Sequence, residues 1–147
     1  MDLKLIDKRS GPDLVYSNEV IADFLHEHLD QYRDKKSDIL KALDYVFAPN
    51  RSGHIILGII DKEIIGAVVI NETGMSGYIP ENILVYIAIH KQHRGKGLGK
   101  VLMQKAISVT TGNIALHVEP DNPAFHLYKK LGFTNKYLEM RLEKSKI

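Results

Sequence analysis

The chain has 147 residues, of which 44% are hydrophobic and 26% charged, and its formal net charge is +2. This size and composition are typical of one globular domain with one core, here residues 1–147, and the small net charge gives no overall attraction to nucleic acid. Because the sequence contains no cysteine, disulfides, a thiol nucleophile and cysteine-based metal sites are excluded.

The first third of the chain predicts one edge strand and two helices. Residues 3–6 have strand character. From Asn18 to Tyr32, apolar residues recur with the spacing of a helix that buries one face. Ser37 is a suitable N-cap for a second helix that runs to Phe47.

The middle of the chain predicts a hairpin, a third strand and a long helix. Residues 54–60 and 63–70 are apolar, β-branched runs joined by the tight turn Asp61-Lys62. Residues 83–89 form another apolar run, and residues 98–109 place apolar side chains on one side of a helix.

The last third predicts a strand over residues 114–118, a helix that opens at Asp121 or Asn122, and final strand material over residues 133–142. Strands with interspersed helices predict an α+β (mixed α/β) fold, in which a mixed sheet is flanked by helices.

The start of the chain and its hydropathy indicate no membrane partner. Residues 1–9 mix acids and bases and lack the apolar core of a signal peptide. No apolar run is long enough to span a bilayer. With the absence of cysteine, these features predict a cytoplasmic protein.

Residues 93–100, His-Arg-Gly-Lys-Gly-Leu-Gly-Lys, are the most informative stretch. Three glycines alternate with cations where a predicted strand leads into a predicted helix, which brings backbone N–H groups and positive charge against a phosphate. The alternatives are a solvated basic turn and a nucleic-acid contact. The nucleic-acid contact is the weaker alternative, because these residues include no aromatic side chains that would stack on bases.

Two familiar phosphate-binding motifs do not fit. In a Walker-type loop, Ser or Thr follows the Gly-Lys pair, but here Val101 follows Gly99-Lys100. A dinucleotide fingerprint that starts at Gly95 or Gly97 has Lys100 or Leu102 at its sixth position instead of glycine.

A third pattern, Arg/Gln-x-x-Gly-x-Gly/Ala, is met by residues 94–99, and it resembles the pyrophosphate loop of the GNAT acyltransferase superfamily. Residues 122–133, an Asn-led helix that carries a Tyr and closes with Gly-Phe, resemble the second signature of that family. The resemblance implies a twisted, mixed and mostly antiparallel sheet of about six or seven strands, flanked by about four helices. It also implies acetyl-CoA as the co-substrate.

The resemblance further implies which residues hold the cofactor. The pyrophosphate would lie on the glycine turn, and the pantetheine arm would run along the strand that ends at Ile89, which requires a splayed or bulged strand edge. The implied cofactor-binding residues are Ile87, Ala88, Ile89, Arg94, Gly95, Lys96, Gly97, Gly99, Lys100, Asn122 and Tyr128.

Tyr128 is the implied catalytic residue, since the matching tyrosine in the family donates a proton to the departing thiolate. The alternative interpretation is a core aromatic residue beside Phe125 and Leu131. Asn122 is also a plausible helix cap.

The general base is open. His117 is a candidate because an imidazole accepts a proton near neutral pH, and alternation along the predicted strand puts it on one face with Ala115. Some family members that modify protein N-termini carry Glu at this position, so the chain departs from them. A histidine that is hydrogen-bonded within the fold is an equally good interpretation, and proton relay through water needs no dedicated base. Weaker candidates are Glu81, Glu119 and Tyr86.

These observations lead to an N-acetyltransferase that moves acetyl from acetyl-CoA to a primary amine by direct attack in a ternary complex. The amine belongs to a small molecule or to a peptide or protein. The resemblance implies that the first two helices and the loop between them line the acceptor site, so Asp34, Lys35 and Lys36 are expected near it. No metal is expected, since the histidines form no strong ligand pattern. The alternative is a non-catalytic acyl-CoA-binding or sensing module. Because dimerisation is common in the family, a homodimer is possible.

Overall fold

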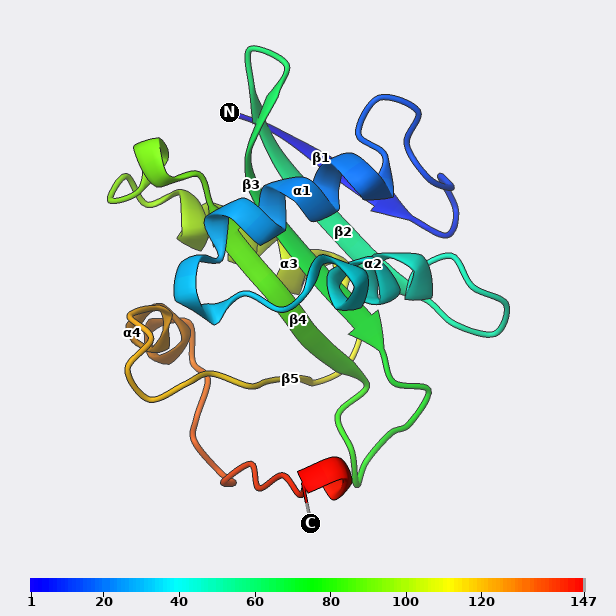
Figure 1. Cartoon of the computed structure of the whole chain (residues 1–147), viewed down its shortest axis with the longest axis vertical. Helices are drawn as coiled ribbons and strands as arrows, with labels where there is room; N and C mark the ends of the chain where they lie inside the picture. The colour runs from blue at the N-terminus through cyan, green and yellow to red at the C-terminus, as the bar shows by residue number, and fades with distance from the viewer. Residues whose placement is uncertain (147) are drawn as a thin grey trace. The chain divides into compact units, whose positions relative to one another are not determined.

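A computed structural model describes residues 1–146 of the chain, and its centre is one five-stranded sheet (Figure 1). The strands lie in chain order, and neighbours are antiparallel except for the last pair, which is parallel. They are β1 (Asp2–Asp7), β2 (Gly53–Ile60), β3 (Glu63–Glu72), β4 (Asn82–Ile89) and β5 (Ile114–Leu116). The predicted mixed, mostly antiparallel sheet is confirmed.

Four α-helices accompany the sheet in the described residues, as predicted. They are α1 (Asn18–His28), α2 (Lys36–Tyr45), α3 (Leu98–Val109) and α4 (Ala124–Lys130). Three short 3-10 turns are η1 (Asp30–Tyr32), η2 (Lys91–His93) and η3 (Lys144–Lys146). The chain forms two compact units, one over Met1–Leu116 and one from His117 onward.

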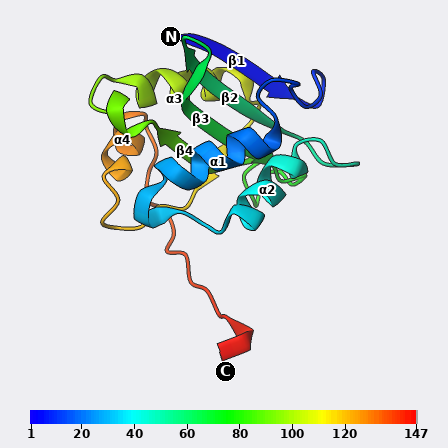
Figure 2. The same cartoon turned by 45° about the horizontal axis from the view of Figure 1, so that its top comes forward.

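In the first unit, α1 and α2 cover one face of the sheet and α3 covers the other (Figure 2). The α1 and α2 side chains at Ile21, Leu25, Ile39 and Leu43 are fully buried in this core. A serine begins α1, because the Ser17 hydroxyl accepts the Val20 N–H at 3.3 Å. Burial of one apolar face per helix therefore fixes both helices on the sheet.

The β2–β3 hairpin turns as its sequence predicts. Asp61 and Lys62 have φ angles of 49° and 68°, the left-handed pair that a two-residue turn between antiparallel strands requires. The turn sets the register that pairs Ile60 with Glu63.

Gly53, the first residue of β2, is required by close packing. A Cβ there would overlap the carbonyl oxygen of Ile70 in β3, and backbone cannot give way as a side-chain tip does. We expect Gly53→Ala to lower the free energy of unfolding by about 3 kcal/mol, the upper end for overpacking. Chemical denaturation measures this. Gly58→Ala is the control, since its Cβ would meet the flexible Met1 side chain, and equal losses in both variants would contradict the argument.

The structure corrects four predictions about the elements. The sheet has five strands because residues 133–142 pair with no strand in the described part of the chain, and Leu138, Met140 and Leu142 there are exposed. The strand predicted over 114–118 ends at Leu116, because its partner Leu84 is the last β4 residue before a bulge.

The first helix ends at His28 and not at Tyr32, because Asp30 takes a left-handed conformation with φ of 56°. The second helix starts at Lys36, so Ser37 is inside it and is not the N-cap. Among residues 1–146, no helix combines the length and the apolar character needed to cross a membrane.

Candidate functional site

Half of strand β4 has an unpaired edge. Its register with β3 pairs Tyr86 with Val69 and Leu84 with Ile70, so Val85 is the extra residue of a β-bulge. On its other side, β4 pairs with β5 only over Asn82–Leu84. In residues 1–146, therefore, no strand pairs with this side of β4 from Val85 to Ile89, and this free backbone edge begins at the bulge.

The free edge carries usable hydrogen-bonding groups. The His90 N–H donates to the Ile65 carbonyl of β3 at 2.8 Å, so by alternation the N–H and C=O of Ile89 and Ile87 point away from β3. The Ile89 carbonyl accepts a hydrogen bond from Arg94 Nε at 3.0 Å. An extended ligand on this edge would find the N–H and C=O of Ile87 oriented towards it. The Ala88 side chain instead lies in the core under α1 and α2.

The glycine turn follows β4 and η2 directly and leads into α3. Gly95 and Gly97 have φ angles of 78° and 77°, which other residues rarely adopt, and nothing lies within 4 Å of a Cβ built on either. Gly97 precedes the first helical residue, Leu98, and no side chain caps the helix there. Gly99 lies in the first turn of α3. The positive end of the α3 dipole is thus left to an anion.

The Arg94 side chain is fixed within the protein. Its Nη1 donates to Asp30 Oδ2 at 2.7 Å and its Nη2 donates to the His28 carbonyl at 2.7 Å, in addition to the Nε bond to Ile89. The Arg94 guanidinium holds the pKa of the Asp30 carboxyl below its usual value, and Lys91 adds to this from 3.4 Å. The charge of Arg94 is therefore largely balanced, and its main structural effect is to tie the glycine turn to the end of α1.

Two other cations of the turn, Lys96 and Lys100, are exposed. They flank the first turn of α3, where backbone N–H groups also concentrate positive potential. Of the predicted charges in residues 94–100, these two lysines are the ones best suited to attract a phosphate.

A buried histidine, which the sequence did not reveal as a site residue, lies beneath this turn. His28 is 5% exposed, its Nδ1 accepts the Lys91 N–H at 3.2 Å, and its ring centroid lies 4.2 Å from that of His90. Burial lowers the pKa of His28. No group of three or more His, Asp or Glu side chains in residues 1–146 has an arrangement that holds a metal ion.

Tyr86 joins β4 to the segment between α1 and α2. Its hydroxyl donates to Asp34 Oδ2 at 2.6 Å, and burial, followed by the Asp34 carboxylate, raises the pKa of Tyr86. Tyr86 and its bulge neighbour Val85 both contact the core under α1 and α2. Of the other residues expected near the acceptor, Lys36 forms ion pairs with Glu19 and Asp23, while Lys35 is exposed as the N-cap of α2.

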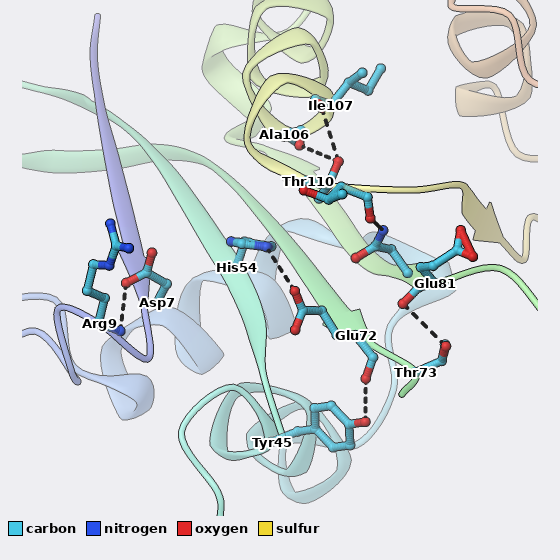
Figure 3. A network of polar contacts seen from close by, with 12 residues as sticks. Asp7, Arg9, Tyr45, His54, Glu72, Thr73, Glu81, Ala106, Ile107 and Thr110 are labelled. Atoms are coloured by element: carbon cyan, nitrogen blue, oxygen red, sulfur yellow. Dashed lines mark hydrogen bonds and ion pairs between the residues drawn. The ribbon is translucent and has the colours of Figure 1, made fainter. Parts of the chain in front are cut away.

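A shallow cavity of about 230 Å³ opens beside the bulge. Its lining comes from α2, β3, β4 and the loop after β3: Tyr45, Asn71, Glu72, Thr73, Ile83 and Val85. Figure 3 shows how the rim is held: the Tyr45 hydroxyl donates to the Glu72 carbonyl at 2.5 Å, and His54 Nε2 lies 3.7 Å from the Glu72 carboxylate. The cavity offers an apolar wall next to the free edge of β4, whereas the Glu72 carboxylate is turned towards His54.

Glu81, a weaker candidate for the base, is bonded to the backbone of neighbouring loops. Its carboxylate accepts the Asn113 N–H at 2.8 Å and the Gly77 N–H at 3.4 Å, and the Asn113 bond is the main cause of its lowered pKa. Its backbone carbonyl faces the Thr73 hydroxyl in Figure 3. A carboxylate stabilised in its charged form is a poor proton acceptor, so Glu81 fits a loop-bracing role better than catalysis.

The second unit carries the remaining predicted residues. The helix begins at Ala124 with Pro123 as its N-cap, so neither Asp121 nor Asn122 opens it as predicted; Asn122 lies just before the cap, where its Oδ1 accepts the Ala124 N–H at 2.9 Å. Tyr128 is 6% exposed, its ring lies 5.8 Å from that of Phe133, and burial raises its pKa to about 12. His117 and Glu119 are exposed and lie beyond the end of β5, so strand alternation does not orient His117 as predicted.

Comparison with known proteins identifies the family of this chain. Residues 18–133 match the sequence profile of the Acetyltransferase (GNAT) family. A ribosomal-protein-alanine N-acetyltransferase from Brucella melitensis biovar Abortus 2308 is 18% identical, with 97% of this chain and 99% of that one covered and a TM-score of 0.63.

Two aminoglycoside acetyltransferases share the same fold. One, from an uncultured soil metagenomic sample, is 17% identical with 97% of each chain covered and a TM-score of 0.66. The other, AAC(6')-Iy in complex with CoA, is 12% identical, with 97% and 93% covered and a TM-score of 0.68. With a profile match over most of its length, the chain belongs to the GNAT acetyltransferase family.

Proposed function

We propose that the protein transfers acetyl from acetyl-CoA to a primary amine. The observation that carries this proposal is the unpaired edge of β4, which begins at the Val85 bulge and leads through η2 into a glycine turn and an uncapped helix. A long ligand with an extended, amide-bearing arm and an anionic end would fit, with its arm on the strand edge and its anionic end at the glycine turn. CoA has both an arm and an anionic end of this kind.

In this proposal, the diphosphate binds at the glycine turn. The N–H groups between Arg94 and Gly99 and the positive end of α3 receive it, and Lys96 and Lys100 supply charge. The left-handed φ angles of Gly95 and Gly97 support the role, because they allow close approach of backbone to the ligand.

The pantetheine arm extends back along β4 as an added strand, with its amides bonded to the backbone of Ile87 and to the Ile89 N–H. The arm is about as long as four to five extended residues, at roughly 3.3 Å each. The thioester therefore arrives beside Val85 and Tyr86. There the acceptor amine approaches from the side of α1 and α2, near Asp34 and the cavity lined by Glu72.

The reaction is direct attack in a ternary complex. The neutral amine nitrogen attacks the acetyl carbonyl carbon, the carbon–sulfur bond breaks, and the amine proton passes to a base or to water. We assign Tyr128 as hydrogen-bond donor to the departing thiolate and Asn122 as a second cofactor contact. His117 is the proposed proton acceptor, directly or through water.

Titration of the protein with CoA, followed by a thiol-release assay with acetyl-CoA, tests the proposal. The assay panel holds small amines, aminoglycosides and peptides with free N-termini or lysines. We expect CoA binding and release of thiol with at least one class of amine. CoA binding without turnover across the whole panel would favour a sensing module, and absence of CoA binding would exclude both functions.

The Tyr86 hydroxyl is expected to matter for the acceptor and not for the cofactor. Tyr86→Phe removes the bond that fixes Asp34, and because Asp34 is exposed, we expect a modest rise of about three- to tenfold in KM for the amine. The dissociation constant for CoA should stay within twofold. Tyr16→Phe, which removes a hydroxyl bond to the Lys62 carbonyl, is the matched control. An unchanged acceptor KM in Tyr86→Phe would contradict this role.

A further inference from the structure

His28 is the one histidine in residues 1–146 that is buried, and it lies at the C-terminal end of α1. Its ring is packed between Phe24, at 4.7 Å between centroids, and His90, at 4.2 Å. Its Nδ1 accepts the backbone N–H of Lys91 at 3.2 Å. A helix of the core thus holds the first residue of η2, the 3-10 turn that precedes the glycine turn.

Two more contacts hold the same segment. His90 caps η2, because its own Nδ1 accepts the Gln92 N–H at 3.1 Å. Arg94 closes the far end of η2 with its bond to the His28 carbonyl at 2.7 Å. The segment from His90 to Arg94 is therefore tied to His28 twice, through the Lys91 backbone N–H and through the Arg94 side chain.

These bonds require a particular protonation state. A ring nitrogen accepts a hydrogen bond only when it carries no proton, so His28 is neutral with its proton on Nε2. That tautomer agrees with the position of Glu27, whose carboxylate lies 3.7 Å from Nε2. A proton added to Nδ1 would face the Lys91 N–H, and the bond would become a repulsive contact.

The surrounding charges oppose that proton. His90, Lys91 and Arg94 disfavour a charged His28, whereas Glu27 favours one. Asp30 lies nearby but pairs with Arg94 and Lys91. Beyond His90, the ring of His93 lies 5.5 Å from that of His90.

We propose that neutral His28 is a positioning residue that holds the glycine turn in its CoA-binding conformation, so that acidification releases the turn and weakens CoA binding. This rests on the proposed function, because it takes the turn to be the CoA site.

The sign of the pH effect follows from the burial of His28. Burial lowers its folded-state pKa from the ordinary 6.5. Just below pH 6.5 the unfolded chain therefore binds a proton that the folded chain does not, and the free energy of unfolding falls as pH falls. As the pH falls through the folded-state pKa, His28 takes up a proton at Nδ1 and the Lys91 bond is progressively lost.

The first test uses the free protein and needs no ligand. Nitrogen-15 NMR of the imidazole rings at pH 7.5 is expected to show the His28 proton on Nε2, and hydrogen exchange of the Lys91 amide is expected to accelerate as the pH falls towards 5, after correction for intrinsic exchange rates. A proton on Nδ1, or an unchanged Lys91 protection factor, would overturn the inference whether or not the protein binds CoA.

The second test measures the dissociation constant for CoA by calorimetry between pH 7.5 and 5. Between pH 7.5 and 5, the affinity of wild type for CoA is expected to fall by a factor on the order of ten more than the affinity of His28→Asn falls. A factor of this size corresponds to the loss of one hydrogen bond that positions a loop. In His28→Asn, the amide oxygen replaces Nδ1 as acceptor but does not titrate. The phosphates of CoA titrate alike against both proteins, so the ratio of their dissociation constants isolates His28.

Two variants complete the design. His28→Leu removes the acceptor, so we expect affinity on the order of tenfold weaker at pH 7.5, with the acid-dependent component gone. His26→Asn, on the same helix, should follow the wild-type pH profile. Thermal unfolding of each protein confirms that it is folded at each pH. If wild type and His28→Asn show the same pH profile, the inference is wrong, and if wild type does not bind CoA at pH 7.5, the proposed function fails instead.

Discussion

Replacement of Tyr128 with Phe is expected to lower kcat by about 10- to 100-fold and to leave the dissociation constant for CoA within twofold. The reason lies in the pKa of Tyr128, which burial raises to about 12. An ordinary thiol has a pKa of about 8.5, so full proton transfer from this phenol to a thiolate is unfavourable by about 5 kcal/mol. In the proposed mechanism, Tyr128 therefore serves as a hydrogen-bond donor to sulfur as charge develops there, a contribution of about 1.5–3 kcal/mol.

Steady-state kinetics with acetyl-CoA and the best acceptor, together with CoA titration, measure this prediction. Tyr137→Phe is the matched control, because Tyr137 is 79% exposed and lies in the same unit. We expect kcat of the control to equal that of wild type. Unchanged kcat in Tyr128→Phe would remove the phenol from the mechanism, and the function would then rest on other donors.

Local sequence patterns predicted most of the elements. The helix predicted over residues 98–109 has the same bounds in the structure, because Gly97 precedes it, the extended Thr110 ends it and its apolar spacing is regular. The Asp61-Lys62 turn was also predictable, since a two-residue connection between apolar strands leaves few backbone conformations. The strand predicted over residues 133–142 is wrong because the prediction used only the local pattern. The segment alternates like a strand, but alternation does not supply a strand to pair with.

The features that make the glycine turn a candidate site depend on distant contacts. Arg94 meets Asp30 and His28 across 64 and 66 positions of sequence, and Lys91 meets His28 across 63. Nothing in the local pattern around residues 28–30 indicates these partners. The sequence does not indicate the Val85 bulge either, because an extra residue in a β-branched run leaves the composition of the run unchanged. Sequence therefore located the turn, whereas the structure showed what holds it and which neighbouring strand edge is free.

Arg94→Met, combined with Asp30→Asn so that the net charge does not change, is expected to weaken CoA binding by about 10- to 30-fold without changing its dependence on salt. Its ion pair with Asp30 is exposed and contributes little by itself. The larger loss comes from the guanidinium bonds to the carbonyls of His28 and Ile89, which hold the turn and the end of β4 together. Since the double variant removes one positive and one negative charge together, the net charge of the turn is unchanged and the screened attraction to the phosphates should stay nearly the same.

Lys96→Met and Lys100→Met give the contrasting result, because these exposed lysines attract the phosphates through solvent. Their loss of affinity should be largest at low salt and should shrink as salt rises, which makes the plot of log Kd against log salt concentration shallower. CoA titrations between about 0.02 and 0.5 M salt separate the two effects. If the Arg94→Met/Asp30→Asn double variant flattens that plot as much as Lys96→Met does, the Arg94 guanidinium contacts the diphosphate directly. The turn must then rearrange when CoA binds, because Asp30 and the two carbonyls would have to release Arg94.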